Sequence, residues 1–196
     1  MRIVPAGLLV GAALAAGVPA KAQAPAVGGR PPYTAADVHF VSGMIVHHAQ
    51  AVLIAGWAPT HEAGPSVRTL CERIVVAQRD EIAFLERWLR ERGEAGADRA
   101  MPGMDHVMLM PGMLTTEQLA RLDHARGPEF DRLFLTFMIQ HHRGAITMVE
   151  QLFGSQGAAQ DGSIFRFAND VNVDQITEID RMSRMLATLP AGGQRP

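Results

Sequence analysis

The sequence has little cysteine and no basic excess, and each deficit excludes a class of protein. Cys71 is the only cysteine in 196 residues, so no disulfide forms within the chain. It occupies an apolar helical position, where we expect a small buried hydrophobe rather than a thiolate ligand. The formal net charge is −2, so the basic surface that nucleic-acid binding requires is missing.

Several catalytic motifs are also missing. The sequence contains no His-Glu-x-x-His, no phosphate-binding glycine-rich loop and no Gly-x-Ser-x-Gly. No Glu-x-x-His pair falls on a predicted helix, so a di-iron site in a helical bundle is not supported. We therefore expect a protein that is not an enzyme. A metal-dependent oxidase, such as a cuprous oxidase, is the minor alternative, since it would need only an exchangeable position at a bound metal.

The N-terminal segment is typical of a secretory signal peptide. Arg2 precedes an apolar run over residues 3–18, and small residues follow with Ala-x-Ala cleavage sites after Ala22 and Ala24. The run is shorter than the about 20 residues that span a bilayer, although an uncleaved anchor stays an alternative. We assign residues 1–24 to the signal peptide and 25–33 to a disordered lead-in. The mature protein is then periplasmic or secreted, without a membrane span.

From Thr34 onward the apolar residues recur at helical spacing, and nothing alternates as in a strand. The pattern predicts long helices over about 34–56, 66–92, 128–154 and 163–189, and a short helix that begins at Thr115. The second pair of long helices repeats the first, at a spacing of 94 residues and then of 97. Residues 34–190 are therefore predicted to form an all-α four-helix bundle of two repeated hairpins, 34–93 and 128–190, joined by a Met-rich loop and short helix over 94–127.

The repeat carries one chemical motif twice. Met-x-x-His-His occurs at residues 44–48 and again at 138–142, where helical spacing places all three side chains on the core side. Thioether and imidazole are soft ligands that favour Cu(I) and Ag(I). The candidate ligands are Met44, His47, His48, Met138, His141 and His142. The alternative is that these are core histidines that only satisfy hydrogen bonds, with the repeat explained by ancestry.

Four further polar residues fall near the core side of the second helix in each hairpin. They are expected either to bond between helices or to accept hydrogen bonds from the ligating imidazoles and so fix their tautomers. These residues are Gln78, Glu81, Gln175 and Glu178.

The loop between the hairpins is a second candidate metal site. Five of the 11 methionines fall within residues 101–113, with Pro and Gly at both ends, so no helical stripe explains them. They fill irregular gaps, or they capture Cu(I) together with one imidazole. The candidate ligands here are Met101, Met104, His106, Met108, Met110 and Met113. Because free imidazole titrates near pH 6.5 and thioethers do not titrate, bundle affinity is expected to fall below about pH 6.

These motifs resemble the bacterial family known as domain of unknown function 305. The likeness rests on the two Met-x-x-His-His helices, the Gln-x-x-Glu pattern that follows each, and the Met-Pro-Gly-Met sequence at 110–113. The resemblance implies an exported protein of ferritin-like fold, related to CopM-like members that bind copper or silver through Met and His. We therefore expect a periplasmic Cu(I)/Ag(I)-binding protein for buffering, resistance or delivery, with another envelope copper protein as a candidate partner. The alternative is a metal-free structural or interaction module of the cell envelope.

Overall fold

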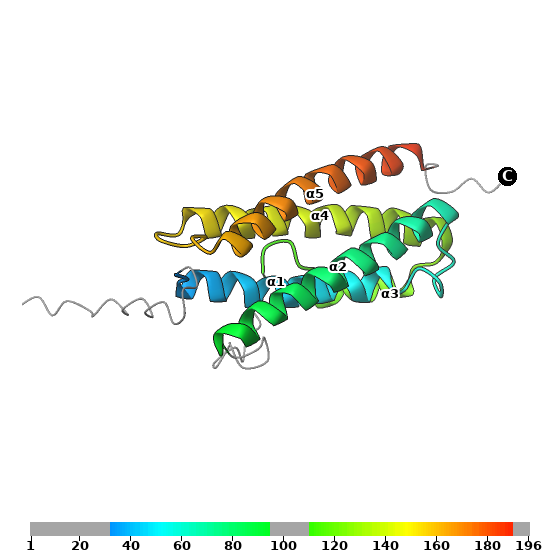
Figure 1. Ribbon diagram of the computed structural model, residues 1–196. Helices are drawn as coiled ribbons and strands as arrows, with labels where there is room; N and C mark the ends of the chain where they lie inside the picture. Colours follow the sequence, from blue (N-terminus) through cyan, green and yellow to red (C-terminus); the bar gives the residue numbers. More distant parts are fainter. Residues whose placement is uncertain (1–31, 95–109, 190–196) are drawn as a thin grey trace, which may run out of the picture.

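The protein is helical throughout the part that its computed structural model describes, residues 32–94 and 110–189. These ranges contain five α-helices and no strand, which confirms the predicted all-α bundle (Figure 1). The predicted signal peptide and most of the Met-rich loop lie outside the described residues. The helices are α1 (Ala35–Ala55), α2 (Pro65–Arg92), α3 (Thr116–His124), α4 (Gly127–Gly154) and α5 (Gly162–Thr188).

Local sequence sets several of the helix ends. At the start of α1, the Thr34 hydroxyl accepts a bond from the Asp37 amide, and the Asp37 carboxylate accepts one from the Thr34 amide. Thr115 and Gln118 form the same reciprocal cap at the start of α3. Helix α2 ends at Gly93, whose φ of 68° suits glycine and few other residues.

The two hairpins pack through their first helices. Helix α1 packs against α2, α4 packs against α5, and α1 and α4 lie between α2 and α5 and pack on each other (Figure 1). The short helix α3 also contacts α4. Helix α1 is long and apolar enough to cross a membrane by length and composition. However, 67% of its apolar window is buried inside the bundle, as expected for a central core helix.

A layer of polar side chains divides the core into two apolar clusters. One cluster joins the first half of α1 to the second half of α4, and the other joins the second half of α1 to the first half of α4. Met44 belongs to one cluster and Met138 to the other. Between them lie six buried polar residues, His47, His48, Gln78, His141, His142 and Gln175.

Each hairpin also binds the backbone of the other one. The buried carboxylate of Asp37, in the first turn of α1, accepts a 2.8 Å hydrogen bond from the Ala159 amide before α5. Its repeat partner Asp131, in α4, accepts bonds of 3.1 and 3.2 Å from the Gly64 amide before α2. The matched aspartates of the two repeats therefore link the hairpins by hydrogen bonds at equivalent positions.

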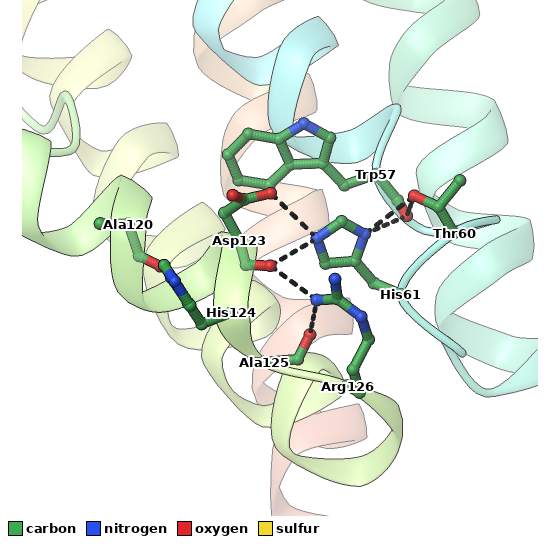
Figure 2. Close-up of polar contacts among 8 residues, drawn as sticks. All are labelled: Trp57, Thr60, His61, Ala120, Asp123, His124, Ala125 and Arg126. Carbon is green, nitrogen blue, oxygen red and sulfur yellow. Dashed lines mark hydrogen bonds and ion pairs between the residues drawn. The ribbon is translucent and has the colours of Figure 1, made fainter.

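A buried histidine ties the turn between α1 and α2 to the end of α3 (Figure 2). His61 places Nδ1 2.9 Å from the Trp57 carbonyl oxygen and Nε2 3.0 Å from the Asp123 carbonyl oxygen, and its ring stacks on Trp57. The Arg126 guanidinium donates to the same Asp123 oxygen. The His61 side chain is thus buried at a helix end, where it binds a terminal carbonyl.

Candidate metal centre

The two Met-x-x-His-His motifs meet in the middle of the bundle. Helix α1 supplies His47 and His48, helix α4 supplies His141 and His142, and all four side chains are at most 1% exposed. The rings of His47 and His141 lie 3.7 Å apart between centroids, across the contact of the two helices. His48 and His142 follow at 6.3 Å on either side. The structure therefore joins both motifs in one row of four imidazoles.

Backbone carbonyls set the tautomers of the two central rings. His47 Nε2 lies 3.0 Å from the Pro111 carbonyl oxygen, and His141 Nε2 lies 2.9 Å from the His47 carbonyl oxygen. Because a carbonyl oxygen only accepts, Nε2 must carry the proton in each ring. A neutral ring then has its lone pair on Nδ1. Both of these Nδ1 atoms are buried, and neither has a partner among the described residues.

Carboxylates stand beside the two outer rings. Glu178 of α5 accepts a 2.6 Å hydrogen bond from His142 Nε2. Glu81 of α2 lies 2.7 Å from His48 Nε2, although the N–H direction is not aligned with it, so this pair is a close contact rather than a formed hydrogen bond. The Nδ1 atoms of both rings are again buried without a partner in the described chain. Glu81 and Glu178 thus each contact one imidazole of the row, and their role as acceptors behind metal ligands stays a prediction.

The two glutamines of this set lie in the same polar layer. Gln78 and Gln175 are each 3% exposed. Within the ranges that the structure describes, the Gln78 side-chain oxygen has no hydrogen-bond partner. A role for these two residues behind the metal ligands therefore stays a prediction.

Burial keeps the central imidazoles neutral. It lowers the pKa of His47 to about 3, with help from repulsion by a protonated His48. Burial and the neighbouring His47 likewise hold the pKa of His141 well below its ordinary value of 6.5. The predicted loss of metal affinity below about pH 6 assumed the pKa of free imidazole, and these lowered pKa values shift that prediction to lower pH for His47 and His141.

The end of the Met-rich loop packs against this row of imidazoles at His47. Residues 110–114, hereafter the strap, lie against both α1 and α4, and the Met110 sulfur approaches α1 beside Gly43. Met110 and Met113 are half-buried there. The other candidate ligands of the loop, Met101, Met104, His106 and Met108, lie outside the described residues.

The thioethers of the two helical motifs do not meet at one point. Met44 and Met138 are fully buried, but they belong to the apolar clusters on opposite sides of the imidazole row. Within residues 32–94 and 110–189, no three His, Cys, Asp or Glu side chains form a group that could hold a metal. The described residues therefore offer a row of imidazoles and, in each of the two apolar clusters, one buried thioether, rather than a closed set of nitrogen and oxygen ligands.

Some residues of the site were not foreseen from the sequence. Gln50 and Gln140 bind the strap, Gly144 lets it approach α4, and Met148 places its terminal carbon beside Gly43. Gln50 could have been suspected, because it is a polar residue one turn after His47 on a core-facing helix. Met148 carries no such signal, because an apolar residue at that position is expected in any core-facing helix.

The remaining candidate ligands are poorly suited to a metal. Cys71 is buried as expected, and burial raises the pKa of its thiol to about 12, so it remains a protonated thiol. His39 and His124 are exposed. The His61 nitrogens already face backbone carbonyls.

Comparison with known proteins identifies relatives of this architecture. A protein of domain of unknown function 305 from Streptomyces coelicolor has a TM-score of 0.70 at 26% identity, covering 82% of this chain and 98% of its own. A fragment from Deinococcus radiodurans of the same family also has a TM-score of 0.70, at 30% identity, covering 81% and 100%. CopM in its Cu(II)-bound form has a TM-score of 0.63 at 26% identity, covering 77% and 95%.

The sequence itself matches one family model. No curated protein matches the chain. The model described as domain of unknown function (DUF305) matches residues 37–186, which contain all five helices apart from the first residues of α1 and the last of α5. The chain therefore belongs to the domain of unknown function 305 family.

Proposed function

We propose that the protein binds Cu(I), with Ag(I) as a mimic, through the imidazoles and thioethers of its two Met-x-x-His-His motifs. One observation carries the proposal: all four Nδ1 atoms of the row are buried and have no partner among the described residues. Leaving a buried polar atom unpaired costs about 1–3 kcal/mol, so four in one layer favour binding of a ligand that accepts their lone pairs. A bound metal ion would supply it.

The ligand set favours a soft ion. Zinc sites in proteins use three or four nitrogen, sulfur or carboxylate ligands, and no such group occurs in the described part of the chain. Each of the two apolar clusters instead contributes one buried thioether, Met44 in one and Met138 in the other. Thioether and neutral imidazole together suit Cu(I).

The relatives and the N-terminus support a role in copper handling outside the cytoplasm. CopM, which is similar in fold to this chain, is known with Cu(II), Cu(I) and silver bound. The apolar N-terminal segment fits a signal peptide. We propose a periplasmic or secreted binding protein that buffers copper, confers resistance, or hands the metal to another envelope copper protein. Residues 101–113 would be an accessory Cu(I) site, and no catalysis is required.

A competition titration tests the bundle site. The mature chain with the five methionines of residues 101–113 changed to Leu isolates the bundle from the accessory site. We expect it to compete with a Cu(I) chelator, and we expect the further change of His47, His48, His141 and His142 to Ala to abolish that competition. His61→Ala is the control, because it removes a buried histidine outside the row. Equal affinity with and without the four histidines would refute the proposal.

Two other functions give different results in the same preparations. A metal-free structural module predicts that Cu(I) leaves the melting temperature unchanged, whereas binding to the folded state raises it. A cuprous oxidase predicts steady oxygen consumption with Cu(I) that is lost on changing His141 and His142. We expect a raised melting temperature and no such turnover.

A further inference from the structure

The strap follows one face of α1 residue by residue. Gly43, His47 and Gln50 lie on successive turns of the helix. A Cβ at Gly43 would lie 3.0 Å from the Met110 sulfur, and His47 Nε2 bonds the Pro111 oxygen. The strap is therefore aligned with α1 over its whole length, with Gln50 at its far end.

Gln50 makes the most complete of these contacts. Its side-chain oxygen accepts a 2.7 Å bond from the Leu114 amide, and its side-chain nitrogen donates a 3.2 Å bond to the Leu114 carbonyl. The side chain is 9% exposed and Leu114 is 1% exposed, so water does not compete freely for these bonds. Such a pair of bonds fixes both the position and the orientation of the backbone on either side of the Leu114 Cα.

Helix α4 holds the other side of the strap. A Cβ at Gly144 would lie 1.8 Å from the Pro111 oxygen, so the backbones touch there. The Gln140 side chain donates a 3.3 Å bond to the Gly112 carbonyl and also bonds Gln118 of α3. The Pro111 carbonyl is thus held between two helices, directly against His47.

Only one of the four imidazoles depends on the strap. His141, the repeat partner of His47, donates instead to a helix carbonyl, that of His47. His142 donates to Glu178. The strap therefore gives His47 a different hydrogen-bond acceptor from His141, although both belong to a Met-x-x-His-His motif.

We propose that Gln50 is a positioning residue for the copper site: it anchors the strap so that the Pro111 carbonyl holds His47 with its proton on Nε2 and its Nδ1 lone pair free for metal. The inference rests on the proposed function, because it assigns Nδ1 of His47 as a ligand. Residues that fix the tautomer of a ligating histidine commonly change metal affinity about tenfold to a hundredfold when they are removed.

The test measures the tautomer of His47 and the Cu(I) affinity of the bundle in separate experiments. In metal-free protein, ¹⁵N shifts of the imidazoles should report a Nε2–H tautomer for His47 and His141 in the parent chain. In Gln50→Leu, His47 alone should become a mixture of tautomers, while His141 stays unchanged. Cu(I) affinity of the bundle, measured with the loop methionines changed to Leu, should fall about tenfold to a hundredfold.

Two further variants guard against a merely structural effect. Gln140→Leu loosens the strap from a half-buried position and should shift His47 in the same direction, even if Gln50→Leu folds poorly. His61→Ala removes a buried histidine and its backbone contacts outside the row, and should leave the His47 shifts unchanged.

Each outcome is decisive. An unchanged His47 tautomer in both glutamine variants would overturn the inference, as would a changed tautomer with unchanged Cu(I) affinity. In both cases the parent chain still binds Cu(I), so the proposed function survives. If the parent bundle does not bind Cu(I), the proposed function fails and this inference fails with it.

Discussion

At the scale of single residues, burial decides the protonation of His47 and His141. Free imidazole takes up a proton near pH 6.5, but the pKa of His47 in the fold is about 3. The same environment leaves Nδ1 without a partner among the described residues. A neutral ring with one satisfied nitrogen and one free lone pair is the form that binds a metal.

This burial predicts a loss of stability in acid. Between about pH 6.5 and pH 3 the unfolded chain binds a proton at residue 47 that the folded chain does not, so the free energy of unfolding falls as the pH falls. The slope is up to about 1.4 kcal/mol per pH unit for each such histidine. Urea unfolding of metal-free protein at about pH 7, 6 and 5 measures it. The slope should be smaller in His47→Gln, and equal slopes would contradict the assignment.

The close contact between the strap and α4 leads to a second prediction, on the stability of glycine variants. A methyl group at Gly144 would collide with the Pro111 oxygen, so Gly144→Ala should displace the strap and destabilise the fold by about 1–3 kcal/mol. The Gly154→Ala change is the matched control, because a Cβ there meets nothing within 4 Å. It should be neutral or stabilising by up to about 1 kcal/mol. Thermal unfolding of both variants compares them, and equal stabilities would contradict the close approach.

At the scale of helices, reciprocal contacts hold the two hairpins in register. Asp37 and Asp131 bind the loop that precedes the second helix of the opposite hairpin. The repeat places Asp37 in the first turn of α1 and Asp131 in the second turn of α4. The antiparallel contact of α1 and α4, which brings His47 onto His141, is thus fixed at both ends of the bundle.

Loss of the Asp131 hydrogen bonds should therefore lower the stability of the whole bundle. Asp131→Ala leaves the Gly64 amide without its acceptor and should lower the free energy of unfolding by about 1–3 kcal/mol. Asp131→Asn keeps one acceptor oxygen and should cost less. Urea denaturation of the two variants measures the difference. A cost that is equal in both would show that the carboxylate acts through its charge rather than through these bonds.

At the scale of the whole molecule, the sequence predicts the bundle well because its signals are local and periodic. The caps at Thr34 and Thr115, and the glycine at position 93, lie at the observed helix ends. The inward direction of His47 and His141 follows from helical spacing, and the structure shows both buried.

The contacts that shape the site are not periodic, and the sequence does not reveal them. Gln50 binds Leu114 across 64 positions, and Asp37 binds Ala159 across 122. Such contacts depend on how the hairpins pack, not on the pattern within one helix. The carbonyl that fixes the His47 tautomer comes from Pro111, which has no side-chain signal for this role.

The most direct test of the account is the position of copper in the loaded protein. Anomalous scattering at the copper edge, from crystals of the mature chain grown with Cu(I), locates the ion independently of any assumed ligand. We expect copper in the layer between α1 and α4, bonded to Nδ1 of histidines in the row and to a thioether of Met44 or Met138. Copper found only on residues 101–113 or on the surface, with the four Nδ1 atoms still unbonded, would contradict it.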